Sequence, residues 1–523
     1  MTVERKKSLQ SLLSGMSEWV VNRFQDTHVT GIAWDSRKVK PGDVFFALVG
    51  ENFDGHQFVS TAIEKGASAI IGTRSPTSLS VPYVQIKGDD RVALAKIAAA
   101  FYDHPSRKLV VIGVTGTDGK TTTTNLVYHI LRTAGIPVGM ISTVNAVIGD
   151  EALDTGFHVT TPEAPDIQRY LARMLEAGLT HVVLETTSHG LAQRRVAEVD
   201  YDLAAVTNVT HEHLDYHLTY TGYLKAKGML FEALSSGEDN HKDGEKLAVL
   251  NKDDESFAYL RKITAAKQLT YSLSKEADLW AGDIVNTPDE LHFTVHGPGL
   301  EFEIQTPMLG QYNVYNSLAA IGLTVFGLDV AVNVAQAAFA TVKTVPGRME
   351  RIDLGQDFLA IVDFAHTPNA IEQALKTART LTEGKLIAVF GSAGLRDVEK
   401  RKMMPETAVR IADEMILTAE DPRTESLDSI LSDMAEGAIR GGGKQGQNFW
   451  LEPDRVTAIR KAVNKAESGD MVILLGKGHE QSMCFGHVEY DWDDRTALRA
   501  ALADRLGVHG PEMPQLPTSP DDD

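Results

Sequence analysis

The feature that most constrains the fold is a glycine-rich turn between an apolar, β-branched segment and a helix-forming one. Residues 109–131 read LVVIGVTGTDGKTTTTNLVYHIL. The run 109–114 predicts a strand, and 121–133 predicts a helix that stops before Gly135 and Pro137. Strand, glycine turn and helix in this order are the parts of a phosphate-binding α/β unit. The order therefore predicts an α/β fold with the turn at the edge of a sheet.

The turn carries the residue types that a bound phosphate chain requires. Glycines let backbone amides curve around an anion, and the start of the helix adds partial positive charge. We expect Lys120 to reach the outer phosphates and the Thr121 hydroxyl to lie on Mg²⁺. The common pattern has glycine five residues before Gly119, where this chain has Val114, so the loop is a variant. A glycine-rich turn without a ligand is the alternative.

Strand and helix signals alternate along the chain, which predicts mostly parallel sheets covered by helices on both faces. An Ala-rich helix is expected at 91–102. Strands are expected at 44–48, 69–72, 83–86, 181–184, 203–206, 247–250, 360–362, 386–390, 415–418 and 471–475.

A chain of 523 residues is long enough for about three domains. A linker-like segment at 341–349, after which the strand pattern restarts, marks one boundary. The predicted divisions are an N-terminal domain at 1–107, a central phosphate-binding domain at 108–343, a C-terminal α/β domain at 344–508, and a disordered Pro- and Asp-rich tail at 509–523.

Composition limits the partners. The net charge of −20 argues against a nonspecific nucleic-acid binder, which is basic overall. The single cysteine, Cys484, excludes an intramolecular disulfide and a multi-cysteine zinc site. No apolar run approaches the ~18 residues of a membrane span, and the N-terminus lacks a signal-peptide pattern. We therefore expect a cytoplasmic monomer without membrane or nucleic-acid partners.

Acidic and histidine side chains follow two predicted strands of the central domain. Glu185 follows one of them and His213 follows the other. Ligands bind beyond the carboxyl ends of parallel strands, and carboxylate and imidazole groups hold divalent cations. We therefore predict that Glu185 and His213 ligate a metal beside the nucleotide. His211 and His217, in the same run, are interpreted as surface loop residues.

Asn251-Lys252-Asp253-Asp254 offers a second interpretation of the nucleotide, because it follows a strand and resembles a guanine-reading NKxD. A polar turn is favoured, since a small GTPase would not need most of this chain and no switch motif follows the loop. No Ser/His/Asp or Cys/His arrangement indicates nucleophilic catalysis.

Ten motifs occur in the order found in one enzyme family. They are GVTGTDGKTTT, ETTSHGLAQRR, TNVTHEHLDYH, NKDD, GQYNVYNSLAA, VPGRMER, VDFAHTPNA, LRDVEKR, EDPRTE and LLGKGHEQ. Over about residues 30–490 the chain resembles the Mur ligases. The segments DSRKVKPGDVFFAL, DGHQF and GKGHE resemble the branch that adds a diamino acid to UDP-N-acetylmuramoyl-L-alanyl-D-glutamate.

This resemblance implies an N-terminal UDP-MurNAc-binding domain, a central ATP-binding domain and a C-terminal Rossmann-like domain that binds the free diamino acid. It also implies an amide-bond-forming, ADP-producing ligase of peptidoglycan synthesis that uses ATP and Mg²⁺. ATP phosphorylates the D-glutamate side-chain carboxylate, and an amine attacks the acyl phosphate.

Two further alternatives remain beside this reading. One is another amide ligase of the superfamily, of the folate–polyglutamate or D-Ala-D-Ala-adding type. The segments DSRKVKPGD, GKGHE and EDPR argue against it. The other is a nucleotide-binding module that has lost catalysis. Intact Lys120, Glu185, His213 and Lys227 argue against it.

The resemblance also implies roles for individual residues. The catalytic residues are Lys120, Glu185, His213, Lys227 and Arg348, of which Arg348 reaches the γ-phosphate. ATP is contacted by Thr115, Gly116, Thr117, Asp118, Gly119, Lys120, Thr121, Thr122, Asn316, Arg348 and Asp363. The metal ligands are Thr121, Glu185, His213 and Lys227, the last as a carbamate. Ser36, His56, Gln57 and Phe58 contact the uridine nucleotide, and Thr160, Thr161, Thr187, Gln193 and Arg195 hold the muramoyl-peptide.

The family's specificity motif reads Glu420-Asp421-Pro422-Arg423 here, and Arg396, Gly476 and Glu480 complete the implied amino-acid site. Enzymes adding meso-diaminopimelate usually have Asp-Asn-Pro-Arg, and those adding L-lysine usually lack the Arg. A guanidinium fork suits the distal carboxylate of meso-2,6-diaminopimelate, which we therefore expect as substrate. The added negative charge at 420 and 421 would instead favour L-lysine or L-ornithine. Asn369, where the family usually has Asp, has no interpretation at this level.

Overall fold

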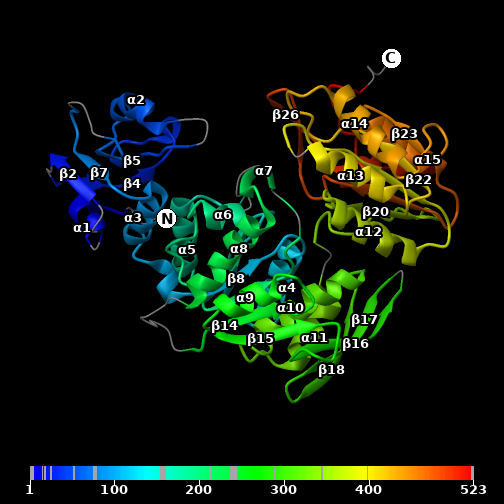
Figure 1. Cartoon of the computed structure of the whole chain (residues 1–523), viewed down its shortest axis with the longest axis horizontal. Helices are drawn as coiled ribbons and strands as arrows, with labels where there is room; N and C mark the ends of the chain where they lie inside the picture. The colour runs from blue at the N-terminus through cyan, green and yellow to red at the C-terminus, as the bar shows by residue number, and fades with distance from the viewer. Residues whose placement is uncertain are drawn as a thin grey trace.

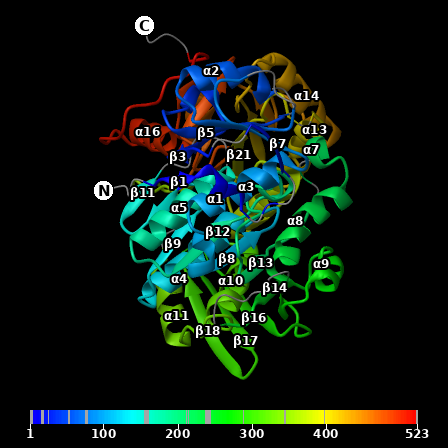
Figure 2. The same cartoon turned by 90° about the vertical axis from the view of Figure 1, so that its left-hand side faces the viewer.

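The protein folds into three α/β units, each built on its own sheet (Figure 1). The computed structural model describes residues 5–519 except 15, 17, 18, 24, 25, 51–53, 75–78, 154–160, 211, 213, 236–243, 288, 343, 344 and 397. Both views place the N-terminal and C-terminal units on the same side of the central unit (Figures 1 and 2). The expected fold class, α/β with mostly parallel sheets, is confirmed.

The N-terminal unit is a five-stranded sheet in the order β2-β7-β6-β5-β4. The strands are β2 (Trp19–Arg23), which is antiparallel to its neighbour, and the parallel β7 (Tyr83–Ile86), β6 (Ala69–Gly72), β5 (Asp43–Ala47) and β4 (Gly31–Ala33). Helices α1 (Leu9–Leu13) and α3 (Asp90–Phe101) cover one face, and α2 (Val59–Glu64) packs on the other. A short pair, β1 (Lys7–Ser8) with β3 (His28–Val29), lies beside α1.

The central unit contains a sheet of 11 strands. In spatial order its parallel strands are β9 (Val138–Ile141), β12 (His181–Glu185), β8 (Val110–Thr115), β13 (Leu203–Val206), β14 (Leu247–Asn251), β15 (Lys267–Ser272) and β16 (Leu279–Asn286). One face packs against α4 (Lys120–Thr133), α10 (Gln311–Thr324) and α11 (Val332–Thr341), and the other against α5 (Ala164–Glu176), α6 (Ser188–Ala192), α8 (Tyr220–Ser235) and α9 (Phe257–Ile263). Burial on both faces explains the continuous apolar runs of these strands.

Antiparallel strands extend the central sheet at both edges. They are β10 (Ala146–Ile148) and β11 (Glu151–Leu153) at one edge, and β17 (Leu291–Gly297) and β18 (Leu300–Thr306) at the other. Along β17, buried and partly exposed residues alternate, as expected where only one face is covered.

The C-terminal unit is a six-stranded sheet in the order β19-β20-β24-β21-β22-β23. Its strands are β19 (Glu350–Arg351), β20 (Leu359–Asp363), β24 (Met471–Leu475), β21 (Leu386–Phe390), β22 (Glu414–Leu417) and β23 (Phe449–Leu451), all parallel except β19. Helices α12 (Pro368–Leu381), α13 (Val398–Ala408) and α14 (Leu427–Arg440) cover one face, and α15 (Arg455–Lys465) and α16 (Asp494–Leu506) the other. A hairpin, β25 (Ser482–Phe485) with β26 (Val488–Asp491), follows β24.

The segment expected as a disordered tail is ordered as far as residue 519. Leu516 is buried in the core beneath α15 and α16. Thr518 and Ser519 donate hydrogen bonds to Asp454 Oδ1 at 3.1 and 3.0 Å. The Pro- and Asp-rich composition suggested disorder, but one leucine docked on a neighbouring apolar surface holds this stretch in place.

Candidate active site

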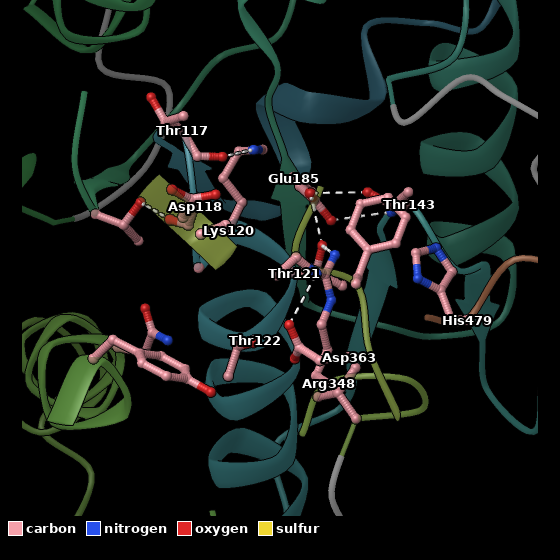
Figure 3. A pocket seen from close by; sticks show the side chains of 18 of the residues that line it. Thr117, Asp118, Lys120, Thr121, Thr122, Thr143, Glu185, Arg348, Asp363 and His479 are labelled. Carbon is pink, nitrogen blue, oxygen red and sulfur yellow. Dashed lines mark hydrogen bonds between the residues drawn. The ribbon is translucent and has the colours of Figure 1, made fainter. Parts of the chain in front are cut away.

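A cavity of about 970 Å³ lies where the central and C-terminal units meet. The loop after β8 and the ends of β12, β13 and β14 form one wall. The linker before β19, the loop after β20 and the loop after β24 form the other. The cavity brings together the predicted residues Thr117, Asp118, Gly119, Lys120, Thr121, Thr122, Glu185, Thr187, Asn316, Arg348, Asp363 and Glu480 (Figure 3).

Glycine conformations and hydrogen bonds from its backbone amides shape the loop between β8 and α4. Gly116 and Gly119 have φ angles of +152° and +81°. A Cβ on Gly116 would lie 1.8 Å from Thr207 Oγ1, so only glycine fits. Asn208 accepts from the Thr117 amide at 2.7 Å and through its side chain from the Asp118 amide at 3.0 Å. Val114 is fully buried inside β8, so the departure from the common pattern lies in the strand and not in the turn.

Helix α4 begins at Lys120 without a side-chain cap, because its N-cap is Gly119. Its first amides therefore point toward the cavity without a capping side chain, an arrangement suited to an anion. Lys120 Nζ folds back to donate to the Thr117 carbonyl at 2.7 Å. These groups together supply the donors that a phosphate chain requires.

Replacing Gly119 with alanine is expected to weaken ATP binding by at least about tenfold, since a clash and a backbone strain both act on the loop. The new Cβ would lie 2.2 Å from Asn316 Oδ1 at a φ of +81°. Gly135, just past the other end of α4, has a similar φ of +73° and nothing within 4 Å. Gly135→Ala therefore carries the strain without the clash. Calorimetric ATP titration compares the two variants. Equal affinities for ATP would show that the close approach of Gly119 to Asn316 is not needed for ATP binding.

Glu185 lies at the carboxyl end of β12 and is only 1% exposed. Its Oε1 accepts from the hydroxyls of Thr121 at 3.0 Å and Thr143 at 2.9 Å, and its Oε2 accepts from the Thr143 amide at 3.0 Å (Figure 3). A carboxylate beside a threonine hydroxyl is a donor set of the kind that Mg²⁺ prefers. Thr121 and Glu185 therefore fit the predicted metal site.

The rest of the predicted ligand set is not assembled in the same way. His213 and its neighbour His211 lie outside the described residues. Within the described part of the chain, no three His, Cys, Asp or Glu side chains gather closely enough to hold a metal ion. The fit therefore rests on Thr121 and Glu185, with Lys227 behind them.

Lys227, on α8, is not the solvated helix lysine that its sequence context suggests. Its side chain is 1% exposed, and Nζ donates to the Gly116 carbonyl at 2.5 Å and lies 4.4 Å from the Tyr223 ring centre. Burial, and then the charge of Lys120, lower the pKa of the Lys227 amine well below its ordinary value. A neutral buried amine directly behind the phosphate loop is the form that adds CO₂.

Arg348 reaches the cavity from the C-terminal unit. Its Nη2 donates to Thr121 Oγ1 at 3.4 Å, and its guanidinium stacks over the Phe364 ring at 4.3 Å. Its Nε is buried and has no hydrogen-bond partner among the described residues, which leaves a donor for an anion in the cavity. Asp363 accepts from the amides of Met349 and Ala365, both at 2.8 Å, so it fixes the backbone beside Arg348 and Phe364.

Two further pairs join the units across the cavity. Asn369 donates to Asp118 Oδ2 at 3.3 Å, and His366 Nε2 lies 3.5 Å from Glu212 Oε1. Burial and then Glu212 raise the pKa of Asp118. An aspartate at 369 would add a third carboxylate here, so asparagine relieves a repulsion.

Sequence reasoning missed several residues of this cavity. They are Thr143, Asn208, Glu212, Phe364, His366 and His479. His366 and His479 lie inside motifs singled out in the sequence, whereas Thr143 follows β9 without any signal. Burial, and then the charges of Arg348 and Arg495, lower the pKa of His479 to about 3, so its imidazole is neutral at pH 7.

Comparison with known proteins gives three consecutive domain matches. The Mur ligase family catalytic domain matches residues 28–104, the Mur ligase middle domain 114–324, and the Mur ligase glutamate ligase domain 347–478. A UDP-N-acetylmuramoyl-L-alanyl-D-glutamate--2,6-diaminopimelate ligase of Geobacillus thermodenitrificans (strain NG80-2) is 41% identical over 497 residues, 95% of this chain and 99% of that protein. The chain belongs to the Mur ligase family.

Other members agree with this assignment. A UDP-N-acetylmuramyl-tripeptide synthetase of Roseiflexus sp. (strain RS-1) is 42% identical, over 92% of this chain and 96% of that protein. A solved UDP-N-acetylmuramoyl-L-alanyl-D-glutamate--2,6-diaminopimelate ligase aligns with a TM-score of 0.62 at 30% identity, over 91% of this chain and 95% of that one.

Family membership removes the GTPase interpretation of residues 251–254. In this Mur ligase the side-chain amide of Asn251 donates to the Thr207 carbonyl at 2.6 Å. Asp253 accepts from the Ser272 hydroxyl at 2.6 Å and the Tyr315 hydroxyl at 2.9 Å. Both side chains join the ends of neighbouring elements, as a structured polar turn does.

The residues expected at the uridine nucleotide lie at the carboxyl-end edge of the N-terminal sheet. Ser36 follows β4, and His56, Gln57 and Phe58 follow β5. The His56 ring is engaged on both sides, by Asp54 Oδ1 at 2.7 Å and by the Thr73 amide at 3.1 Å. Gln57 and Phe58 are exposed beside it, so His56 braces the turn that presents them.

The residues expected at the muramoyl-peptide form a hydrogen-bonded group on the central unit, apart from Thr160, which lies outside the described residues. The hydroxyls of Thr161 and Thr187 are 2.9 Å apart. Arg195 donates to the Thr161 carbonyl at 2.8 Å and to Gln193 Oε1 at 2.6 Å. Of this group, Thr187 lines the cavity.

The residues expected at the amino acid lie in three loops of the C-terminal unit. Arg396 follows β21, residues 420–423 follow β22, and Gly476 and Glu480 follow β24. Of these, Glu480 lines the cavity. A Cβ on Gly476 would lie 2.2 Å from Glu420 Oε2, so these two loops touch. In the described residues, no helix is both long and apolar enough to cross a membrane.

Proposed function

We propose that this Mur ligase is the ATP-dependent enzyme that joins meso-2,6-diaminopimelate to UDP-N-acetylmuramoyl-L-alanyl-D-glutamate in peptidoglycan synthesis. The observation that carries the proposal is the near-complete alignment, at 41% identity, with a relative of that name. The meeting of the phosphate loop, Glu185 and Arg348 in one cavity supports it.

We further propose the division of labour among the units. Residues 1–107 bind the uridine nucleotide, 108–343 bind ATP, and 344–508 bind the diamino acid. We also propose that the enzyme acts as a monomer.

The site residues offset the negative charge of the reacting phosphate and carboxylate groups. ATP with Mg²⁺ supplies a phosphoryl group, which converts the poorly electrophilic D-glutamate carboxylate into an acyl phosphate. Thr121, Glu185, His213 and carbamylated Lys227 would hold the metal. Lys120, from α4, and Arg348, from the C-terminal unit, face this point from opposite walls and offset the negative charge as two anions approach. Placement of the reactants between the two walls of the cavity orients them and excludes water.

The direct test is release of phosphate from ATP in the presence of UDP-N-acetylmuramoyl-L-alanyl-D-glutamate. meso-Diaminopimelate, L-lysine and L-ornithine are supplied separately. The highest kcat/KM is expected with meso-diaminopimelate, because Arg423 offers a bidentate donor to its distal carboxylate. Failure of all three amino acids to support release would rule out the proposed function, and preference for L-lysine or L-ornithine would replace the amino acid alone.

A further inference from the structure

Lys477 is a buried cation that joins two loops of the amino-acid site. It follows β24, and its side chain is 1% exposed. Its Nζ lies 3.0 Å from Asp421 Oδ1 and 2.6 Å from Glu480 Oε2. Strand β21 separates β24 from β22, the strand that precedes Asp421. Lys477 therefore bridges loops that are not neighbours in the sheet.

Asp421 is fixed by more than this ion pair. Its Oδ1 also accepts from the Cys484 amide at 3.0 Å, and its φ of +39° is an unusual value for a side chain with a Cβ. The Cys484 carbonyl in turn accepts from the Arg423 amide at 3.0 Å. Asp421 thereby ties the backbone of Arg423 to the hairpin after β24.

The two carboxylates that Lys477 contacts differ in whether they line the cavity. Asp421 is 6% exposed and does not line the cavity, whereas Glu480 does. Burial lowers the pKa of the Lys477 ammonium, but Glu480 and Asp421 outweigh burial and the net shift is upward. Lys477 therefore stays charged and compensates Asp421 and Glu480 together, which leaves one net negative charge in the cluster, with Glu480 on the cavity side.

Glu420, the other departure from the usual motif, is also buried and does not line the cavity. It is 9% exposed and touches Gly476, and burial raises its pKa. Both acidic departures are therefore largely buried among the loops of the C-terminal unit.

We infer that Lys477 is a specificity-determining positioning residue for the amino-acid substrate. It neutralises Asp421 and holds the loop of Arg423 against the loop of Glu480, which keeps a diamino acid with a distal carboxylate preferred over one with a bare distal amine. The inference rests on the proposed function and deepens it.

The test compares Lys477→Met, Asp421→Asn and the double variant. Lys477→Met leaves a buried carboxylate unpaired, so the KM for meso-diaminopimelate is expected to rise about a hundredfold while the KM for ATP stays within about twofold. The preference for meso-diaminopimelate over L-lysine should fall with it. The double variant removes the unpaired carboxylate and should recover to within about tenfold of the unaltered enzyme.

Asp421→Asn keeps the inference falsifiable if Lys477→Met does not fold. Because Lys477 already cancels this charge, Asp421→Asn should change the amino-acid preference by less than about fivefold. A larger change would mean that the Asp421 charge faces the substrate, which overturns the inference. A Lys477→Met variant with a lower kcat, a higher KM for both ATP and meso-diaminopimelate, and an unchanged amino-acid preference would also overturn the inference.

A matched control is Lys385→Met, in the same unit. Lys385 is 54% exposed and pairs with Glu414 at 3.3 Å, so its loss should leave the preference unchanged. The unaltered enzyme distinguishes failure of the inference on Lys477 from failure of the proposed function. If the unaltered enzyme uses none of the diamino acids, the proposed function fails whatever the variants do.

Discussion

Replacement of Lys227 by alanine is expected to lower ATP-dependent turnover about a thousandfold, because several kcal/mol of charge stabilisation are lost with the proposed metal ligand. The unmodified amine is buried and donates to the Gly116 carbonyl. Burial outweighs the nearby carboxylates of Glu212, Asp118 and Asp254 in setting its pKa. Its lowered pKa favours the neutral form that reacts with CO₂. A carbamate on Lys227 would place negative charge beside the phosphate loop, where a metal cation can bind it.

The decisive measurement is rescue. Alanine leaves a space that a short carboxylate such as acetate or formate fills, so added carboxylate should restore part of the rate of phosphate release. Lys225→Ala, on the exposed side of the same helix, is the control and should keep full activity. Full activity of Lys227→Ala would refute the carbamate, and loss without any rescue would leave Lys227 as a packing residue of the loop.

Several parallel strands could be predicted from the sequence because they are buried on both faces and read as continuous apolar runs. The runs at 203–206, 386–390 and 471–475 have the predicted bounds in the structure. Strands β16, β17 and β18, toward one edge of the central sheet, were not predicted, since one of their faces is partly exposed and their polar residues weaken the apolar pattern. Pairing across a sheet also depends on segments distant in sequence, which local patterns do not report.

The candidate site was predictable to the extent that it follows strand ends. Lys120 and Thr121 follow the loop after β8, Glu185 ends β12, and all three line the cavity. Burial of Lys227 was not predictable, because its neighbours on α8 read as an ordinary helix. Contacts between units, such as Asn369 with Asp118, depend on how two separately folded sheets meet. A departure at a single position therefore gained its interpretation only from the structure.

Replacing Arg455 with alanine is expected to destabilise the C-terminal unit by about 3–5 kcal/mol, the usual cost of stranding one member of a buried ion pair. Arg455 and Asp494 are both 0% exposed and form a two-point pair at 2.8 and 2.6 Å. Arg455 also donates to the carbonyls of Ala419 at 3.1 Å and Leu475 at 3.0 Å, at the ends of β22 and β24. Its loss therefore strands a carboxylate and two carbonyls.

Denaturant unfolding would measure this change against Arg460→Ala on the same helix. Arg460 pairs with Asp504 at 3.4 Å on the surface, with 47% and 63% of the two side chains exposed, so its loss should cost less than about 0.5 kcal/mol. In Arg455→Met with Asp494→Leu the stranded carboxylate is gone, so part of the stability should return. The remaining deficit would report the two carbonyls and the Trp492 indole N–H, which donates to Asp494 at 2.8 Å. Equal effects of Arg455→Ala and Arg460→Ala would show that the buried pair contributes no more to stability than the surface pair.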